Sequence, residues 1–428
     1  MYLGIDFGTS GARACVIAPS GEIEDMARTD FGRLAEFEIA PAWRDTLFSL
    51  IAQIPLGMRK RLAALAIDGT SASVLACDEA FIPVHPPLLY NDARATEQAA
   101  RIRQVAGNQH AAGAATSGLA KAIWLNRHAG QSGSTSRRYL NQADWLSALL
   151  SGQAVSDYHN ALKMGVDLET GAWPDWVAGL IDLHALPKLV KPGQGIGLID
   201  RPRGRELGIN PDCLIRAGTT DSIAAFLAAG DAGQTRQPGA AVTSLGSTLV
   251  LKLLSDKRVD AGEYGIYSHW FGNQWLAGGA SNAGGAVLRP HFNDAELIAL
   301  SREINPDRPS SLDYYPLPVK GERFPYNDPE RPPCLEPRPE SRTEFLHAIL
   351  QGLAKIEALG YAKLAELGAT RLRSVVSAGG GAKNPAYSQI RARLLQVPLS
   401  QASQDEACYG SARLARHGCT LFPGEHDA

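Results

Sequence analysis

An aspartate inside an apolar run opens the sequence. Asp6 is followed by a turn of small residues that includes Gly8, Thr9 and Ser10, and the apolar run resumes at Cys15. The pattern predicts a strand, a tight turn and a second strand, which together form a β-hairpin. A buried carboxylate needs a basic side chain, backbone N–H groups or a metal ion as its partner. The turn offers N–H groups and two hydroxyls, which bind phosphate, but a hairpin with a hydrogen-bonded aspartate explains the stretch equally well.

A second hairpin of the same plan is predicted about 240 residues later, in "VTSLGSTLVLKLL", with Gly246, Ser247 and Thr248 in its turn. Each turn leads into a strand rather than a helix, and the G-x-x-x-x-G-K-[ST] pattern of a P-loop is absent. Turns of this kind form anion-binding nests of backbone N–H groups. Two such hairpins at the starts of two halves could hold one phosphate chain, whereas two unrelated hairpins are the alternative.

A third motif, "VVSAGGGAKNPAYSQIRARLL", joins an apolar strand to a helix through Gly379, Gly380 and Gly381. Asn384 is placed as the N-cap of that helix and Pro385 as its first residue. Glycines leave bare backbone against which a flat ring can lie, and a helix N-terminus favours anions. A triple glycine alone is also plain turn chemistry, so the motif gains meaning from its order after the two hairpins.

A fourth motif, "CLIRAGTTDSIAAFLAAGD", predicts a strand, a Gly-Thr-Thr turn and a helix capped by Asp221 and closed by Gly230. A carboxylate at a helix N-terminus is stabilised in its charged form. Asp221 is therefore either a proton acceptor or only a helix cap.

The elements that must position these motifs alternate between strands and helices. The 428 residues predict at least two domains, with a boundary between residues 217 and 218. Ten of the 26 prolines fall in residues 305–342, which predicts an extended arm rather than helix or central strand. Helices are predicted over 96–106, 120–128, 141–152 and 343–368.

Composition limits the function classes. A net charge of −2 argues against nucleic acid as the main partner, because phosphate neutralisation needs a basic excess. No apolar run approaches the roughly 20 residues that span a bilayer. The six scattered cysteines form no zinc or disulfide pattern, and with no signal peptide visible they favour a cytoplasmic location.

The order of DFGTSGAR, LGST and AGGGAKN resembles the phosphate-1, phosphate-2 and adenosine motifs of the actin-like ATPases. Within that superfamily the chain resembles the FGGY carbohydrate kinases. "PPLLYNDARATE" is similar to the family's W-N-D-x-R stretch, with Tyr90 in place of tryptophan, and "GERFPYNDPERP" matches its GER-x-P-x-x-DP arm. The resemblance covers nearly the whole chain.

The resemblance implies an α/β fold of two actin-like, ribonuclease H-like domains, 1–217 and 218–428. Each is a mixed sheet flanked by helices, and the nucleotide lies in the cleft between them. ATP and Mg²⁺ are the implied cofactors. Asp6 would face the metal and Asp221 would be the catalytic base. The turns of residues 8–10 and 246–248 would hold the phosphates, and Gly379, Gly380, Gly381 and Asn384 would bind the adenosine.

The acceptor is expected to be a pentulose. Ser222 stands where many family members carry an amide, and the chain resembles the compact plant and cyanobacterial kinases that act on D-ribulose. Ser71 and Ser222 are small hydroxyl donors that could face the sugar, together with Asp221. D-xylulose, another polyol and a non-kinase actin-like ATPase are the alternatives. Further polar residues could line the sugar side or serve as ordinary loop hydrogen-bonding groups: Tyr90, Asn91, Asp92, Asp157, Asn160 and Lys163.

Overall fold

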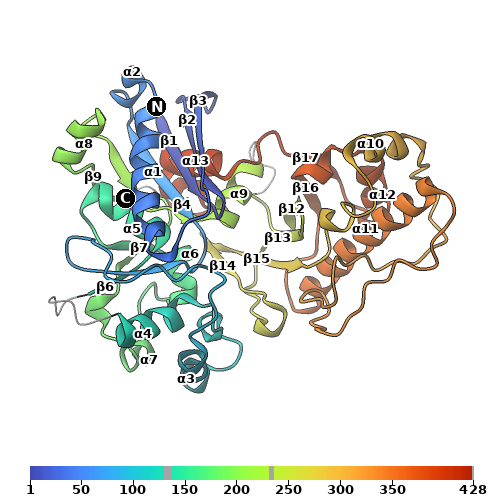
Figure 1. The fold of residues 1–428 in the computed structure, drawn as a ribbon, viewed down its shortest axis with the longest axis horizontal. Coiled ribbons are helices and arrows are strands. Elements are labelled where there is room, and N and C mark those ends of the chain that lie inside the picture. Colours follow the sequence, from blue (N-terminus) through green and yellow to red (C-terminus); the bar gives the residue numbers. More distant parts are fainter. Residues whose placement is uncertain (130–136, 231–235, 427–428) are drawn as a thin grey trace. The chain divides into compact units, whose positions relative to one another are not determined.

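The computed structural model describes residues 1–129, 137–230 and 236–426. Its contacts divide the chain into two compact units, residues 1–228 with 406–428 and residues 229–405 (Figure 1). The predicted boundary between residues 217 and 218 therefore differs from the structural one. The reason is packing: helix α9 (Asp221–Ala229) lies so close to helix α13 (Ala407–His417) that a Cβ on Gly410 would be 1.9 Å from the Ala224 carbonyl oxygen.

The first unit is built on a seven-stranded mixed sheet. The predicted opening hairpin is confirmed, because β1 and β2 pair in antiparallel fashion, while β1 and β4 are parallel neighbours. The strand order is β3-β2-β1-β4-β10-β9, with β11 beside β4. The strand bounds are β1 Tyr2–Phe7, β2 Gly11–Ile17, β3 Ile23–Asp30, β4 Ala64–Gly69, β9 Gly195–Leu198, β10 Leu214–Arg216 and β11 Thr219–Thr220.

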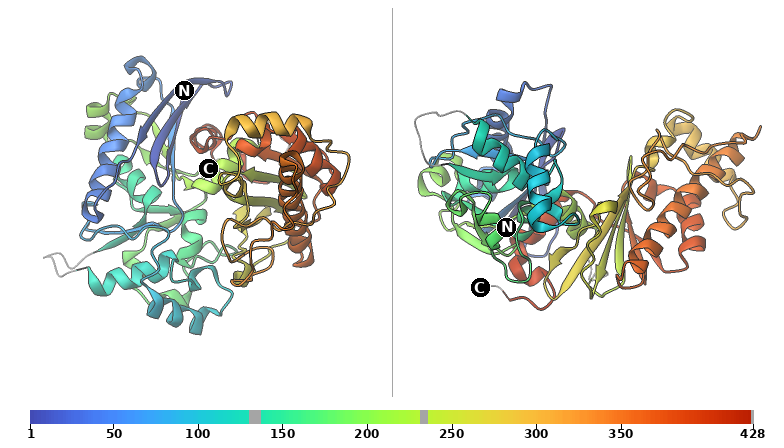
Figure 2. Two further views of the ribbon diagram at one scale, coloured as in Figure 1. Left: turned by 45° about the vertical axis from the view of Figure 1, so that its right-hand side comes forward. Right: turned by 90° about the horizontal axis from the view of Figure 1, so that it is seen from below.

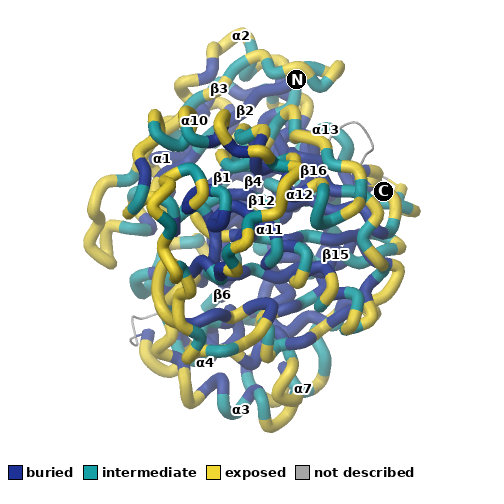
Figure 3. Tube along the Cα trace, turned by 90° about the vertical axis from the view of Figure 1, so that its right-hand side faces the viewer, coloured by how far each residue is buried: buried dark blue, intermediate teal, exposed yellow. Residues whose placement is uncertain are grey.

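The two faces of this sheet are buried differently. Alternate side chains of β1, such as Leu3 and Ile5, join a core with helix α1 (Ile39–Gln53). The other face meets α13, and Gly4 permits that approach because a Cβ there would lie 2.0 Å from the Ala412 nitrogen. The burial shows as dark blue traces along β1 and β4 in Figure 3. By the strand period of two, Asp6 shares the α13 face with Gly4.

Helices and short strands complete the first unit. Three predicted helices are confirmed: α3 matches its predicted range, α4 begins two residues early, and α5 ends at a left-handed Gly152. The remaining bounds are α2 Leu56–Arg59, α3 Thr96–Ala106, α4 Gly118–His128, α5 Gln142–Ser151, α6 Tyr158–Ala161, α7 Asp175–Ala178, α8 Arg201–Leu207, β5 Val74–Cys77, β6 Arg138–Asn141, β7 Val155–Asp157 and β8 Lys188–Val190.

The second unit is a six-stranded mixed sheet in the order β14-β15-β13-β12-β16-β17. The predicted second hairpin is β12 and β13, and β16 is the parallel neighbour of β12. Helices of this unit pack beside its strands (Figure 2). The bounds are β12 Ala240–Leu245, β13 Leu249–Ser255, β14 His269–Phe271, β15 Gln274–Ser281, β16 Ser374–Ala378, β17 Leu399–Gln401, α10 Asp294–Glu303, α11 Arg342–Glu366 and α12 Pro385–Leu395.

The proline-rich segment between α10 and α11 has no named helix or strand, as predicted. Tyr314 and Phe324 anchor it, with exposed fractions of 3% and 1%. The Phe324 ring fits against Gly279 of β15 and Gly360 of α11, where added Cβ atoms would each approach it to 2.8 Å. The arm is thus an ordered part of the second core.

A fully buried ion pair lies under the central strands of the second unit. Arg391 of α12 donates from Nε and Nη2 to Glu357 of α11 at 2.6 and 2.7 Å. Its Nη1 donates to Ser377 of β16, while Thr243 of β12 donates to Glu357 at 2.6 Å. Two helices are thereby bonded to the two strands that end at the glycine-rich turns.

Candidate active site

Two carboxylates lie side by side at the carboxyl ends of β1 and β4. Asp6 and Asp68 are Cα partners in the parallel register of these strands, and their exposed fractions are 4% and 0%. Ser411 of α13 donates to Asp68 Oδ2 at 2.6 Å, and Arg13 approaches Asp6 Oδ2 at 3.4 Å. Among the described residues Asp68 Oδ1 has no hydrogen-bond donor.

Burial and the interaction between the two side chains govern the charge of this pair. Burial, and then the negative charge of Asp6, raise the pKa of Asp68 well above its usual range. Burial also raises the pKa of Asp6, against the opposing influence of Asp68 and Arg13. A cation between the two carboxylates would relieve both effects. Mg²⁺ is held by one or two carboxylates with waters and phosphate oxygens, so the orphaned Asp68 oxygen and its neighbour Asp6 fit this ion.

The predicted phosphate turn follows Asp6 directly. Gly8 donates its N–H to the Gly11 carbonyl at 3.0 Å, and the Ser10 carbonyl accepts from the N–H of Phe31. Thr9 and Ser10 are exposed. The turn therefore presents both hydroxyls to solvent next to the buried carboxylates, as an anion site requires.

Asp221 comes to the same edge of the sheet. Thr219 of β11 is the Cα partner of Asp68, so Asp221, the first residue of α9, follows two positions later. The charge of Asp221 acts on Asp68, and Asp221 Oδ1 accepts the N–H of Ser222 at 2.6 Å. The first unit thus brings together three carboxylates, the outermost of which lie 215 positions apart in the sequence.

A half-buried lysine, Lys163, adds positive charge beside Asp221. Burial lowers the pKa of the Lys163 ammonium, and the Asp221 carboxylate opposes that shift. Asp157 and Asn160, which could line the sugar side, are bonded to each other: Asn160 Nδ2 donates to Asp157 Oδ2 at 2.6 Å, and Asp157 caps α6. Burial raises the pKa of Asp157 to about 6.

The two motifs of the second unit also meet at one sheet edge. Ser244 of β12 and Ala378 of β16 are Cα partners, so the turns of Gly246 and Gly379 emerge together. Gly379 has φ +82°, and a Cβ on it would lie 3.0 Å from the Leu245 carbonyl oxygen. A Cβ added to the neighbouring Gly380 would meet no atom within 4 Å, whereas one added to Gly381 would lie 2.9 Å from the Leu245 Cβ. Ser247 and Thr248 are exposed in their turn.

Asn384 has the predicted structural place. Its side-chain oxygen accepts the N–H of Tyr387 at 3.1 Å as the N-cap of α12, and Pro385 is the first helical residue. Its Nδ2 donates to Ser301 at 2.8 Å. Both amide atoms therefore hold the fold, and contact between Asn384 and a nucleotide stays a prediction.

A small cavity of about 170 Å³ borders the phosphate turn inside the first unit. Gly8 and Thr9 form one wall, and Thr70, Gln142 and Tyr90 form another. Apolar side chains close the rest, among them Phe31, Ile39, Trp43 and Leu89. Ser71 lies in the turn next to Thr70 but is not on the wall. The cavity is small for a nucleotide and suits a compact polar molecule.

Lys121 holds the two loops beside this cavity. Its side chain is fully buried, and its Nζ donates to the carbonyl of Ala72 at 2.9 Å and to that of Leu89 at 2.5 Å. These carbonyls belong to the turn after β4 and to the loop that carries Tyr90. The lysine therefore fixes the spacing of these two segments next to the cavity.

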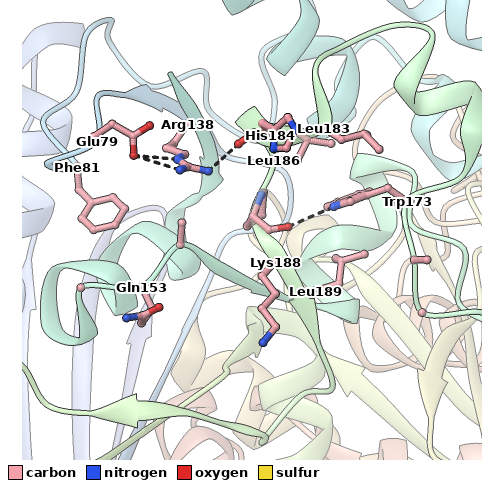
Figure 4. Close-up of a pocket in the computed structure, with 15 residues that line it drawn as sticks. Glu79, Phe81, Arg138, Gln153, Trp173, Leu183, His184, Leu186, Lys188 and Leu189 are labelled. Carbon is pink, nitrogen blue, oxygen red and sulfur yellow. Dashed lines mark hydrogen bonds and ion pairs between the residues drawn. The ribbon is translucent and has the colours of Figure 1, made fainter. Parts of the chain in front are cut away.

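A larger cavity of about 670 Å³ lies elsewhere in the first unit (Figure 4). Arg138 crosses part of it to bond Glu79 and the His184 carbonyl, while Lys188, Trp173 and Gln153 also line it. None of the predicted site residues is on its wall. Volume alone therefore does not identify the active site.

Sequence reasoning missed three residues: Asp68 beside Asp6, Gln142 on the wall of the small cavity, and Lys121 next to that cavity. Asp68 had a signal, because "LAIDGT" repeats the pattern of "LGIDFGT" and the two strands are parallel neighbours. Gln142 and Lys121 had none, since both lie on helices whose apolar spacing only marks them as buried.

The comparisons with known proteins agree with this architecture. The N-terminal domain of the FGGY family of carbohydrate kinases matches residues 1–228, and its C-terminal domain matches residues 241–419. The chain belongs to the FGGY family of carbohydrate kinases: it is a phosphotransferase with an alcohol group as acceptor, and ATP is the phosphoryl donor that this family implies.

Individual relatives are distant but nearly full-length. A xylulose kinase of Lactococcus lactis is 22% identical over 450 residues, which cover 98% of this chain and 88% of the relative. A crystal structure of a xyloylose kinase from Brucella ovis superposes with a TM-score of 0.83 at 22% identity, covering 98% of this chain and 90% of the other. A glycerol kinase from Plasmodium falciparum, solved with ADP, gives 0.81 at 15% identity, covering 99% and 90%. These structures confirm the predicted two-domain fold.

In the described part of the chain, every helix falls short of the length and apolar character that crossing a membrane requires.

Proposed function

We propose that this kinase transfers the γ-phosphoryl group of ATP to the terminal hydroxyl of a pentulose, D-ribulose, with Mg²⁺. The observation that carries the proposal is the position of Asp221, which follows β11 beside the Asp6–Asp68 pair and near the Lys163 ammonium. A proton acceptor is thereby adjacent to a cation and phosphate site. Phosphoryl transfer depends mainly on positioning and charge neutralisation at such a site.

In the proposed reaction the sugar oxygen attacks the γ-phosphorus while its proton passes to Asp221. A new O–P bond forms, the bond from the γ-phosphorus to the β,γ-bridging oxygen breaks, and ADP leaves with that electron pair. A weak base suffices, because in a loose transition state the proton can leave late. Lys163 holds positive charge next to Asp221, and Thr9 and Ser10 supply hydroxyls to the phosphoryl oxygens. When bound, Mg²⁺ would neutralise phosphate charge, and Asp6 and Asp68 would hold it.

We also propose that the two glycine-containing turns of the second unit bind the nucleotide. Ser247 and Thr248 are exposed hydroxyls beside Gly246 in the second phosphate turn, and Gly379, Gly380 and Gly381 leave backbone bare at the same sheet edge. We assign the phosphates to the turn of residues 246–248 and the adenosine to the glycines of residues 379–381. Asn384 contributes through the helix whose N-terminus it caps.

We favour D-ribulose as the acceptor because Ser222, a short hydroxyl side chain, directly follows Asp221. Ser71 supplies another small hydroxyl in the turn after β4. D-xylulose is the second candidate, because relatives such as the Lactococcus lactis enzyme are named xylulose kinase. Hydroxyl-matched sites reject a substrate lacking the matching group strongly, but epimers differ only in geometry.

The test is a panel of D-ribulose, D-xylulose, L-ribulose, gluconate and glycerol with ATP and Mg²⁺. ADP release gives kcat/KM for each acceptor, and mass spectrometry identifies the product. The highest kcat/KM is expected with D-ribulose. A higher value with D-xylulose or glycerol would remove the ribulose assignment. ATP turnover that no acceptor accelerates would contradict the proposed reaction as a whole.

A further inference from the structure

The side-chain amide of Gln142, the first residue of α5, has a fixed orientation. Its Oε1 accepts the backbone N–H of Thr70 at 2.9 Å and the Thr70 hydroxyl at 2.9 Å. A backbone N–H can only donate, so the atom facing it must be the amide oxygen. Nε2 therefore points away from Thr70, and exchanging the two amide atoms would break both bonds.

The neighbouring residues hold this amide in place. Gly69 makes room for it, because a Cβ at Gly69 would lie 2.9 Å from Gln142 Oε1. The Thr70 hydroxyl also bonds the Ser73 hydroxyl at 2.6 Å, and Ser73 Oγ accepts the N–H of Tyr90 at 3.0 Å. The amide thus belongs to a network that joins the turn after β4 to the loop containing Tyr90.

The Nε2 atom of Gln142 has no hydrogen-bond partner in that network. Gln142 is 1% exposed, and Nε2 is a buried donor for which the described residues provide no acceptor. Leaving a buried amide donor unpaired costs about 1–3 kcal/mol, so a native structure keeps one only where something else accepts it. Gln142 lines the small cavity of about 170 Å³ beside Gly8 and Thr9. Because Gln142 is on the wall of that cavity, an acceptor bound there would satisfy Nε2.

The cavity defines the chemistry of its occupant. The phosphate turn closes one end, Gln142 and Thr70 give a polar edge, and Trp43 and Leu89 give an apolar wall. A short polyhydroxylated chain fits this lining, with its C–H face on the apolar side and a hydroxyl oxygen toward Nε2. We propose that Gln142 Nε2 donates a hydrogen bond to a hydroxyl of the acceptor sugar and is a specificity-determining residue of this kinase. This inference rests on the proposed function.

The first test separates the donor from the rest of the side chain. Gln142→Glu keeps an oxygen for Thr70 and replaces the Nε2 donor. We expect KM and the calorimetric Kd for the preferred ketose to rise about 10- to 100-fold, with KM for ATP within about twofold of wild type. Gln153→Glu makes the same change at an exposed residue of the larger cavity (Figure 4) and should leave both KM values unchanged. Unchanged sugar KM and Kd in Gln142→Glu would overturn the inference.

The second test needs no variant and therefore does not depend on Gln142→Glu folding. The wild-type enzyme is titrated with analogues of the preferred ketose that each lack one hydroxyl. One analogue is expected to bind about 10- to 100-fold more weakly, and Gln142→Glu should not distinguish that analogue from the parent sugar. Equal wild-type affinity for all analogues and the parent would overturn the inference. If the wild-type enzyme phosphorylates no ketose, the proposed function fails first, and the acceptor panel reports that separately.

Discussion

Asp6 and Asp68 occupy the same register position on two parallel neighbouring strands, and both carboxylates face α13. Ionising both of these buried neighbouring carboxylates is unfavourable in the protein alone. The first unit therefore carries a local electrostatic cost at this edge of the sheet, which a bound cation would remove. Destabilised sites of this kind are typical of functional regions.

The first prediction concerns Asp6→Asn. The substitution keeps the side-chain shape and removes one of the two charges, so we expect kcat/KM to fall by on the order of 10²-fold through lost metal binding. The same change relieves repulsion with Asp68, so the melting temperature without ligand should stay level or rise. Assays over a Mg²⁺ series and thermal unfolding measure both effects. Near wild-type turnover at limiting Mg²⁺ would show that Asp6 does not hold the metal.

The second prediction concerns Asp221→Asn. Asparagine can still accept the N–H of Ser222 and suits a helix start, so folding and sugar binding should persist. Loss of the proton acceptor should lower kcat by on the order of 10²- to 10⁴-fold. Asp212→Asn, at an exposed residue, is the matched control. A variant within a few-fold of wild type in kcat, at saturating ATP and sugar, would leave Asp221 with a structural role only.

The third prediction concerns pH and Lys121. Burial lowers the pKa of this ammonium to about 7, while Asp92 opposes the shift and Lys163 adds to it. In the unfolded chain the group titrates near 10.4, so between pH 7 and 10 the unfolded state binds more protons. The free energy of unfolding should therefore rise with pH across this window because of Lys121.

Lys121→Met should reduce that slope by up to about 1.4 kcal/mol per pH unit. Denaturant unfolding of the first unit at pH 7, 8 and 9 measures it. Lys60→Met, at an exposed lysine, should leave the slope unchanged. Parallel wild-type and Lys121→Met profiles would argue that Lys121 has the same proton affinity in both states.

The fourth prediction concerns the buried Glu357–Arg391 pair. Removing one partner leaves an uncompensated buried charge, so Arg391→Met should cost about 3–5 kcal/mol of stability. The double variant Glu357→Leu/Arg391→Met should cost less than Arg391→Met alone, because it leaves no lone charge. Denaturant unfolding of the second unit compares the three proteins. A double variant that is no more stable than Arg391→Met would contradict a coupled pair.

Local signals predicted the elements well. The Asn384-Pro385 pair placed the start of α12 because capping chemistry acts within one turn of helix. Alternating apolar residues placed both hairpins, and the density of prolines placed the extended arm.

Features that depend on distant residues were beyond sequence reasoning. The partnership of Asp6 with Asp68 is a matter of strand register, and the orientation of the Gln142 amide depends on Thr70, which lies 72 positions away. Asp157 caps α6, since a buried carboxylate binds the nearest N–H groups, and its sugar-side role stays a prediction. The unit boundary at 228 follows from packing of α9 on α13, and no local pattern marks it.

Helix α13 has a consequence for how the protein is made. It covers the face of β1 and β4 that carries Asp6 and Asp68, yet the ribosome produces it only after residues 229–405. The second unit can fold during synthesis as one uninterrupted segment. The first unit must wait with one sheet face uncovered until residues 407–417 emerge. A nascent chain stalled before residue 406 should therefore expose the α13-facing side of β1 and β4 to chaperones, and ribosome-bound fragments digested with protease should be cut in the first unit before the second.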